Sequence, residues 1–496
     1  MGIIQKQALR TTVLSLFGSV FGSVTRIGMS LLITEAQIGL MQLLDAISGL
    51  FSIIFSLGYE QVLSKLFPTF RDEEKGHHGF LVFGIMLSLV GTALSFLIYY
   101  FFSDFFLTDN PQTNQLFKAF SFLVFPLIFF RIVFRNLDGY AKMLFSTVIG
   151  VFLDGFVSKL ILACGILAFY LTYIDYEYLL YVYTICFSIP GIVIAVYAFA
   201  KTKNIVLPHK SLVGSGNRKR LGEYMLFGIM VSASGSIVLY VDSVMVNKLI
   251  SLEALGVYSI LFFAARLIAI PAKGIIRISN VVIAESWKKN DLKNIQDIYS
   301  KSCLNQMLIA AFMFGVGWAC LDTVMQFSPK LASYSAHIYV FFFLGLGLTV
   351  EMATGVNAVI IATSTKFRYN TYFGFLLAIL IIIFNFIFIY FYGIEGAAIA
   401  SMLAMVIINL LRWLMLYKSF NLQPFNANFL KGLLISIAFI ILCSFIDLDI
   451  EPKLKLLIYF LGLSGLFWII VIRLKISEDI NAWLSKIKNT LIKRKQ

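Results

Sequence analysis

Long apolar segments recur along the whole of this 496-residue chain, and they constrain its fold more than any other feature. A helix needs about 20 apolar residues to cross the hydrocarbon core of a bilayer. Hydrophobic residues make up 59% of the chain and charged residues only 13%. In soluble proteins about 25% of residues are charged. The pattern therefore predicts an all-α polytopic membrane protein.

The apolar runs predict about fourteen transmembrane helices joined by short loops. The expected ranges are 9–33, 36–57, 80–102, 116–134, 144–170, 178–199, 224–249, 254–284, 304–325, 338–362, 369–391, 393–417, 430–446 and 454–472.

Lysines and arginines collect in every second gap between these ranges, whereas the alternate gaps hold acidic residues such as Asp104, Asp175 and Glu177. The gap after the fourth range, for example, holds Arg135 and Lys142. This positive-inside pattern predicts a multi-pass protein of the cytoplasmic (inner) membrane with both termini in the cytoplasm. It also accounts for the net charge of +14 without a nucleic-acid partner.

A basic linker divides the predicted helices into two parallel six-helix lobes plus two C-terminal helices. We expect an N-lobe at 1–200, a cytoplasmic linker at 201–223 and a C-lobe at 224–418. Spans 13 and 14 fill 419–474, and 475–496 form a basic amphipathic cytoplasmic tail.

An internal sequence repeat supports the division into two lobes. Polar residues share one face of the first and the seventh predicted helix, at the same steps and a constant shift of 217 residues: Ser15, Ser19, Ser23, Arg26 and Ser30 against Ser232, Ser236, Tyr240, Ser243 and Asn247. At the same shift Gly39 falls on Gly256. Two polar faces in one register followed by a matched turn predict an internal duplication about an axis along the membrane normal.

The tail has its own pattern. Ile476, Ile480, Trp483, Ile487 and Leu491 share one helical face, lysines cover much of the rest, and Ser477 is a candidate N-cap. The segment is typical of a helix lying on the anionic inner leaflet, with a disordered basic tail as the alternative.

Arg26 lies inside the first apolar segment, where an arginine costs about 3 kcal/mol on insertion scales. Such a residue usually faces a protein interior or a wet cavity, so Arg26 indicates a negatively charged cargo. Arg266 and Lys273 share one face of the eighth span with Arg277, which is close enough to the membrane surface to snorkel. Arg26 is the one deep arginine that we assign to the N-terminal half, and Lys159 is a further candidate cavity cation there.

Other charged residues in the spans have two readings each. Asp154 and Lys159 either neutralise each other or face a cavity. Asp242, beside the repeat counterpart of Arg26, either pairs with Arg26 or couples transport to an ion or proton, and Glu351 is a second deep carboxylate of this kind. The expected polar cavity face comprises Ser19, Ser23, Ser30, Ser236, Tyr240, Ser243 and Asn247.

Motifs for soluble catalysis are missing from the sequence. It contains neither GxxxxGK[ST] nor HExxH, and its five cysteines are scattered. The predicted outer loops are too short to house an active site. We therefore expect no enzyme, no catalytic residues, no cofactor and no metal.

With these features, the chain resembles the multidrug/oligosaccharidyl-lipid/polysaccharide exporter superfamily, and within it the polysaccharide transporter (Wzx-like) flippases. The resemblance rests on the architecture and on three segments: Thr25–Leu44, Phe55–Pro68 and Val241–Ile260. It implies alternating access around a cationic cavity between the lobes, with Arg26, Arg266 and Lys273 on the spans that line it.

The implied cargo is a polyprenyl-diphosphate-linked oligosaccharide, specifically an undecaprenyl-diphosphate-linked repeat unit for O-antigen, capsule or exopolysaccharide. Its partners would be the lipid bilayer and a polysaccharide polymerase machinery. Lipid II flippases usually carry several early arginines, so a single deep arginine disfavours lipid II. The alternatives are a cation-coupled multidrug exporter of the same fold and a membrane enzyme of envelope glycan assembly such as a polymerase.

Overall fold

Helices make up all of the regular structure in the part of the chain that the computed structural model describes, residues 3–108, 110–209, 212, 214–236 and 238–482. They form two compact units. Unit 1 comprises Met1–Ile260 and Leu377–Gly393, and unit 2 comprises Leu261–Leu376 and Ile394–Gln496. Residues 224–260 thus pack within unit 1, so the units do not coincide with the predicted lobes, which stay a prediction.

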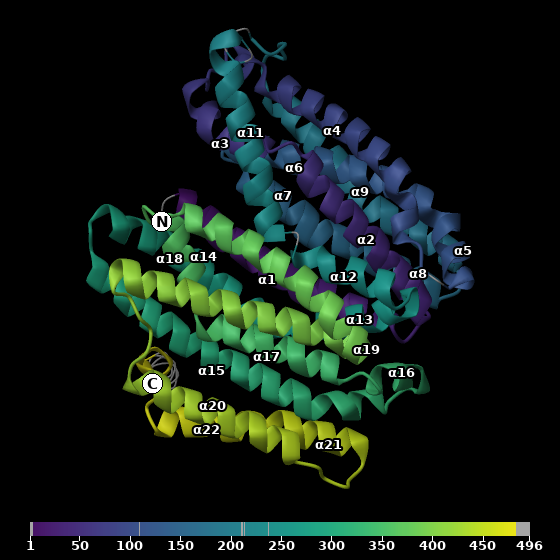
Figure 1. Cartoon of the computed structure of the whole chain (residues 1–496), viewed down its shortest axis with the longest axis vertical. Coiled ribbons are helices and arrows are strands. Elements are labelled where there is room, and N and C mark those ends of the chain that lie inside the picture. Colours follow the sequence, from purple (N-terminus) through teal and green to yellow (C-terminus); the bar gives the residue numbers. More distant parts are fainter. Residues whose placement is uncertain (1–2, 109, 210–211, 213, 237, 483–496) are drawn as a thin grey trace, which may run out of the picture. The chain divides into compact units, whose positions relative to one another are not determined.

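Unit 1 is built around α6, which packs against α2, α4 and α9 (Figure 1). Besides a stretch of α19, its elements are α1 (Ile3–Met29), α2 (Glu35–Phe55), α3 (Tyr59–Leu66), η1 (Phe67–Thr69), η2 (Gly76–Gly79), α4 (Phe80–Phe102), η3 (Ser103–Phe106), α5 (Pro111–Phe120), η4 (Ser121–Leu123), α6 (Val124–Met143), α7 (Thr147–Phe152), the π-helical turn η5 (Leu153–Val157), α8 (Ser158–Tyr170), α9 (Tyr176–Lys201), α11 (Ser215–Ser236), α12 (Val238–Leu249) and most of α13 (Leu252–Arg266).

In unit 2, α15 packs against α14, α17 and α20, and Figure 1 shows α15, α17 and α20 running side by side. The elements are η6 (Leu267–Ala269), α14 (Ile270–Lys288), α15 (Leu292–Met325), η7 (Pro329–Leu331), α16 (Ala332–Ser335), α17 (Tyr339–Ala353), α18 (Asn357–Thr363), most of α19 (Arg368–Phe420), α20 (Ala427–Phe445), α21 (Pro452–Ile458), the π-helical turn η8 (Tyr459–Leu463) and α22 (Ser464–Arg473).

Ten helices of the described residues are long and apolar enough to cross a membrane, or eleven if the bent pair Pro329–Ser335 and Tyr339–Ala353 is one span. Among them, α19 has 53 residues, which at 1.5 Å per residue would span about 80 Å. The hydrocarbon core is about 30 Å thick. Gly393, the first residue of the predicted range 393–417, breaks α19 with φ 58° and ψ −132°. All fourteen predicted ranges fall largely on helical residues of the described structure, and their number as spans stays a prediction.

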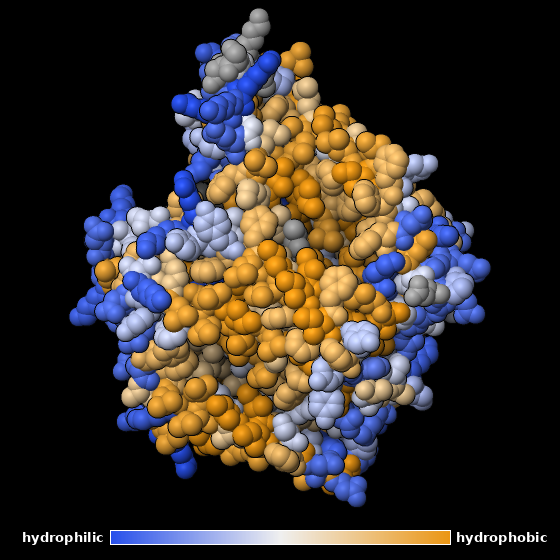
Figure 2. All heavy atoms as spheres, in the orientation of Figure 1, coloured by the Kyte–Doolittle hydropathy of each residue, from blue (hydrophilic) through white to orange (hydrophobic). Residues whose placement is uncertain are grey.

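Apolar side chains cover the outer faces of these helices as well as their cores. Figure 2 shows hydrophobic residues over the middle of the helices of unit 2 and hydrophilic residues toward their ends. In unit 1, Leu97 and Phe101 of α4 are 55% and 71% exposed. Exposed apolar surface of this extent requires lipid, which confirms a multi-pass membrane protein.

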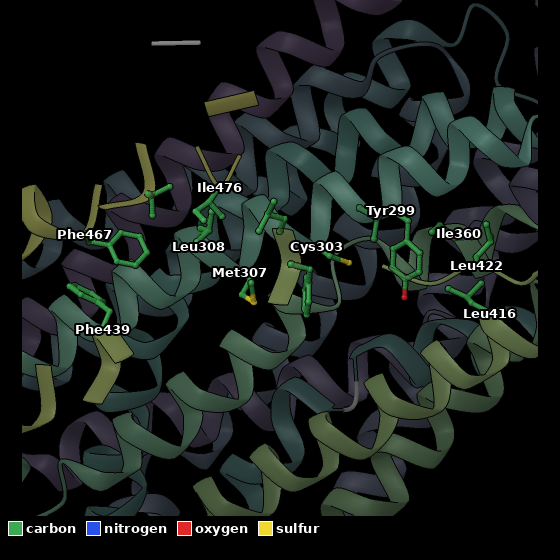
Figure 3. Packing of buried hydrophobic residues seen from close by; sticks show 14 of the residues in the cluster. Tyr299, Cys303, Met307, Leu308, Ile360, Leu416, Leu422, Phe439, Phe467 and Ile476 are labelled. Carbon is green, nitrogen blue, oxygen red and sulfur yellow. The ribbon is translucent and has the colours of Figure 1, made fainter. Parts of the chain in front are cut away.

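The core of unit 2 follows α15. Tyr299, Cys303 and Met307 succeed one another along this helix, and Figure 3 shows Phe439 beside Phe467. The centroids of these two rings are 4.6 Å apart.

Two glycines make reciprocal close contacts within unit 1. A Cβ on Gly39 of α2 would lie 1.9 Å from the carbonyl oxygen of Leu252, and a Cβ on Gly256 of α13 would lie 2.0 Å from that of Glu35. The shift of 217 residues converts each contact into the other. An internal repeat predicts this reciprocity, and only glycine allows the backbones to approach so closely.

The start of the predicted tail packs onto unit 2. Ser477 caps a helical turn as predicted, because its Oγ accepts a hydrogen bond from the Ile480 amide at 3.3 Å. However, Ile476 is 1% exposed within the core of unit 2, and Ile480 packs against that core. The prediction that both face the membrane surface is therefore wrong, since the protein core buries them. Trp483, Ile487 and Leu491 lie outside the described residues.

Candidate functional site

A cavity of about 450 Å³ lies among the helices of unit 1. Nine of its fourteen lining residues are charged, five basic and four acidic. The lining residues are Arg26, Asp45, Ser52, Glu60, Arg131, Phe134, Arg135, Asp138, Lys142, Asp154, Lys159, Phe187, Pro190 and Tyr240. Charged side chains within transmembrane segments are costly and usually mark a substrate or ion path, so this cavity is the candidate site.

Two arginines converge on one carboxylate in the cavity. Nη2 of Arg26 lies 3.5 Å from Oδ2 of Asp45, and Nη2 of Arg131 donates a hydrogen bond to Oδ1. Nη1 of Arg131 donates to the backbone oxygen of Asp45 at 3.1 Å. The three side chains come from α1, α2 and α6 and are 11–15% exposed. The cluster carries a net positive charge because one carboxylate neutralises only one of the two arginines.

Aromatic packing fixes one of these arginines further. Cζ of Arg131 lies 4.0 Å from the ring centroid of Phe187 on α9, and Nζ of Lys159 lies 5.8 Å from the same centroid. A cation over an aromatic face is stabilised by about 0.5–2 kcal/mol, more when it is desolvated. The ring of Phe187 therefore holds two of the five cations at the cavity wall.

Charged residues form a ladder along α6. Arg131, Arg135, Asp138 and Lys142 follow steps of 4, 3 and 4 and so share one face of the helix over about 16 Å. Nζ of Lys142 lies 2.9 Å from Asp138 Oδ2 and 3.6 Å from Glu60 Oε1 on α3. The ladder thus leads from the Asp45 cluster to the C-terminal end of α6, which the predicted topology assigns to the cytoplasmic side.

Arg131 corrects the expectation that Arg26 is the one deep arginine of the N-terminal half. It lies within the apolar range 116–134, and Arg135, expected in a cytoplasmic gap, also lines the cavity. The sequence alone could have indicated Arg131, because Arg131, Arg135, Asp138 and Lys142 are spaced at helical steps as regular as those of the polar residues on the first and seventh predicted helices. The ground for disfavouring lipid II as cargo is thereby removed.

Asp154 and Lys159 both line the cavity, on η5 and α8. The ion pairs found among the described residues do not include a pair between the two. Asp154 lies in a π-helical turn, a geometry that often occurs at functional sites. Both side chains lie at the cavity wall, and their role there stays a prediction.

Within the predicted polar face, Tyr240 is the residue whose described side chain lines this cavity. Ser243 accepts a hydrogen bond from Gln42 at 3.1 Å, and Asn247 donates to the Phe106 carbonyl at 2.9 Å.

The serines of α1 are bound locally. The hydroxyls of Ser19 and Ser30 donate to carbonyl oxygens of their own helix at 2.7 Å. Ser23 is half-buried, and the side chain of Ser236 lies outside the described part. The polar cavity face as a whole stays a prediction.

Asp242 is buried in unit 1, where its carboxylate accepts hydrogen bonds from Tyr258 at 2.9 Å and from Asn385 of α19 at 2.7 Å. Arg26 forms an ion pair with Asp45, which α2 brings to the cavity. The role of Asp242 in pairing with Arg26 or in coupling stays a prediction.

The remaining predicted residues belong to unit 2 or its border. Arg266, at the end of α13, lies with Cζ 5.3 Å from the ring centroid of Phe262. Lys273 of α14 and Glu351 of α17 are exposed. None of the three lines the cavity of unit 1 in the described structure, so their part in substrate binding stays a prediction.

The arrangement suits the binding of a polyanion. Planar guanidinium groups bind phosphate through two parallel hydrogen bonds, and lysines add point charge. In the described part of the chain, no group of three or more His, Cys, Asp or Glu side chains could hold a metal ion.

Comparisons with known proteins agree with this architecture. The sequence pattern of a family described as polysaccharide biosynthesis protein matches residues 4–284. The chain is similar in structure to the lipid II flippase MurJ in an inward closed conformation, with 15% identity, a TM-score of 0.71 and coverage of 93% of this chain and 98% of that chain. No curated protein matches the sequence.

Two further solved structures share the fold. One is a multidrug resistance MATE family transporter of the MOP superfamily, inward-facing, with 13% identity, a TM-score of 0.63 and coverage of 87% of this chain and 98% of that chain. The other is a MOP superfamily transporter from Pyrococcus furiosus, with 14% identity, a TM-score of 0.53 and coverage of 88% and 97%. At such identities these likenesses show the fold.

Proposed function

Because the chain belongs to the polysaccharide biosynthesis protein family and has the fold of flippases and transporters of the MOP superfamily, we propose that it is a flippase. Its cargo is an undecaprenyl-diphosphate-linked oligosaccharide repeat unit. It moves this lipid across the cytoplasmic membrane by alternating access, for O-antigen, capsule or exopolysaccharide assembly. A polysaccharide polymerase machinery would then act on the exported units.

The observation that carries this proposal is the pair of arginines, Arg26 and Arg131, that line one cavity and both contact Asp45. A diphosphate is the part of the lipid-linked substrate that needs such a site, because its charge must leave water to cross the bilayer. Arg135 and Lys159 add positive charge on the same wall. The undecaprenyl chain would stay in the lipid.

The chain contains no ATP-binding motif, so an ion gradient would have to drive transport. We propose Asp242 for coupling to a sodium or proton gradient, because its carboxylate is buried among the helices of unit 1. Asp242→Asn keeps the size of the side chain and removes its charge. In proteoliposomes it should abolish the stimulation of transport by an imposed gradient. Retained stimulation would exclude Asp242 as the coupling residue.

Lipid II is the second candidate cargo. It is favoured by Arg131, a second deep arginine in the N-terminal half, and by the likeness in fold to a lipid II flippase. Lipid II also carries a polyprenyl diphosphate, so the same arginines would bind it. Competition between lipid II and a lipid-linked repeat unit in one translocation assay separates the two cargoes.

A multidrug exporter and a membrane enzyme remain the alternatives. The net positive charge of the Asp45 cluster disfavours cationic drugs, which it would repel. A drug-susceptibility screen of cells with and without the protein tests the first alternative, and a change of glycan length in vitro would identify a polymerase.

The test of the proposal is translocation of a fluorescent lipid-linked oligosaccharide in proteoliposomes. Arg26→Ala should reduce the rate at least about tenfold, because losing a charge-assisted bond of 1.5–3 kcal/mol weakens substrate binding by that much or more. Arg473→Ala, at an exposed arginine at the end of α22, is the matched control. The Arg26 variant should still insert and accumulate.

Two results would contradict the proposal. One is the absence of translocation by the wild-type protein, and the other is an equal rate for Arg26→Ala and wild type. If the Arg26 variant fails to accumulate, Arg131→Lys provides a second test, because it keeps the charge while removing the planar fork.

A further inference from the structure

Asp45 occupies the place that an anionic ligand would take on the two arginines. Each of its carboxylate oxygens meets a different guanidinium, Oδ2 that of Arg26 and Oδ1 that of Arg131. The two arginines come from helices that are separate in sequence, so the carboxylate bridges α1 and α6. A phosphoryl group, with oxygens a similar distance apart, can bridge two guanidinium groups in the same way.

The cluster retains capacity for a stronger anion. Two cations share one carboxylate, and Nε of Arg131 is buried without a hydrogen-bond partner in the described structure. An unmet donor of a charged group costs free energy in a buried position. A ligand with more charge and more acceptor oxygens than a carboxylate would satisfy these groups better.

We propose that Asp45 is an internal counter-ion that holds Arg26 and Arg131 until the diphosphate of the substrate displaces it, and that recaptures them when the substrate leaves. This inference rests on the proposed function, because it names what competes with the cargo at that site. The exchange is between ion pairs only, and no covalent bond changes.

The counter-ion has two consequences. It keeps two buried arginines paired while the cavity is empty, which lowers the cost of the empty state. It also opposes binding, so that the substrate is held less tightly and departs sooner. Asp45 therefore lowers the affinity for the substrate and raises the turnover rate.

Asp138 offers a matched comparison. It lines the same cavity and is also an aspartate, but its partner is Lys142 at 2.9 Å rather than the two arginines. Asp45→Asn and Asp138→Asn each remove one negative charge from the cavity. Only the first removes the group that competes for Arg26 and Arg131.

The experiment measures binding of geranylgeranyl diphosphate to the purified full-length protein, with uncharged geranylgeraniol as the reference probe. Asp45→Asn should bind the diphosphate about tenfold more tightly, the effect of removing one competing charge-assisted hydrogen bond. Asp138→Asn should change the affinity much less, about twofold or less by screened long-range charge. In proteoliposomes Asp45→Asn should turn over more slowly than wild type despite its tighter binding.

A double-mutant cycle sharpens the result. In an Arg131→Ala background Asp45→Asn should tighten binding less than in the wild-type background, because one of the two arginines that Asp45 occupies is gone. Equal tightening by Asp45→Asn and Asp138→Asn would overturn the inference, since the effect would then be cavity charge alone. Weaker binding by Asp45→Asn together with a lower unfolding temperature would also overturn it, by making Asp45 a structural pair.

The same binding experiment tests the proposed function independently of the counter-ion inference. The proposed function fails if wild type binds geranylgeranyl diphosphate no better than geranylgeraniol. If wild type prefers the diphosphate through Arg131, and Asp45→Asn binds it no more tightly, only the counter-ion inference is overturned.

Discussion

At the scale of single residues, charge in an apolar setting decides what the cavity of unit 1 can bind. Arg26 and Arg131 are each costly alone, and Asp45 offsets part of that cost by pairing with both. Removing one member of a buried ion pair lowers stability more than replacing the whole pair by apolar residues, because the other charge is left buried without its partner. The three residues therefore act as a unit, and their substitutions should not be additive.

Arg131→Ala should reduce transport as strongly as Arg26→Ala and should also destabilise the protein. Arg131 bonds the side chain and the backbone of Asp45 and lies over Phe187, so its loss removes contacts of about 2 kcal/mol. Translocation rate and the thermal unfolding midpoint in detergent measure the two effects. Unchanged stability and transport would show that Arg131 is neither anchor nor ligand.

At the scale of helices, the sequence repeat appears as a contact between α2 and α13. Gly39 and Gly256 each receive a backbone carbonyl of the other helix, at positions that the shift of 217 residues relates. The polar faces of the same repeat diverge in use, because Tyr240 lines the cavity while Ser243 and Asn247 bond neighbouring elements. The predicted internal repeat is thus reflected more closely in the packing of these glycines than in the contacts of the polar faces.

Gly39→Ala and Gly256→Ala should each lower the unfolding midpoint and the accumulated amount of protein. A Cβ at either position would lie 1.9–2.0 Å from a backbone carbonyl oxygen, so the helices must move apart, at a cost of about 1–3 kcal/mol. Gly28→Ala on α1 is the matched control, because a Cβ there meets nothing within 4 Å. Equal behaviour of the three variants would refute close α2–α13 packing.

At the scale of the whole molecule, apolar periodicity was enough to predict the helices. Every predicted range falls largely on helical residues of the described structure, as expected where each backbone group must be satisfied within its own segment. The break of α19 lies at Gly393, the first residue of the predicted range 393–417. The membrane class followed from composition, and the transporter fold was implied by the family resemblance.

The partners of the charged residues were beyond prediction from the sequence. Arg26 meets Asp45 because helix packing brings together residues that belong to different helices. Arg131 was detectable by its spacing but lay near the end of a predicted span, where snorkelling to the surface is the usual interpretation. Ile476 was placed on the membrane because a periodic face does not reveal what covers it.

The predicted topology gives a test at this scale. Cysteine at Lys203 should be shielded from a membrane-impermeant thiol reagent in intact cells, and cysteine at Tyr173 should react, because the positive-inside pattern assigns the two loops to opposite sides. The five native cysteines are replaced first, although four of them are buried. The reversed labelling pattern would invert the topology and move the α6 ladder to the outer side.

The central claim is that a lipid-linked saccharide enters the cavity of unit 1. A photo-crosslinking amino acid at Phe134, which lines this cavity, tests it directly in cells that make the substrate. The same group at Phe101 of α4, 71% exposed on an outer face, is the control. Irradiation should attach lipid-linked glycan at position 134, in an amount that Arg131→Ala reduces, and little at 101. Equal attachment at both positions, or none at 134 with a working transporter, would contradict the account.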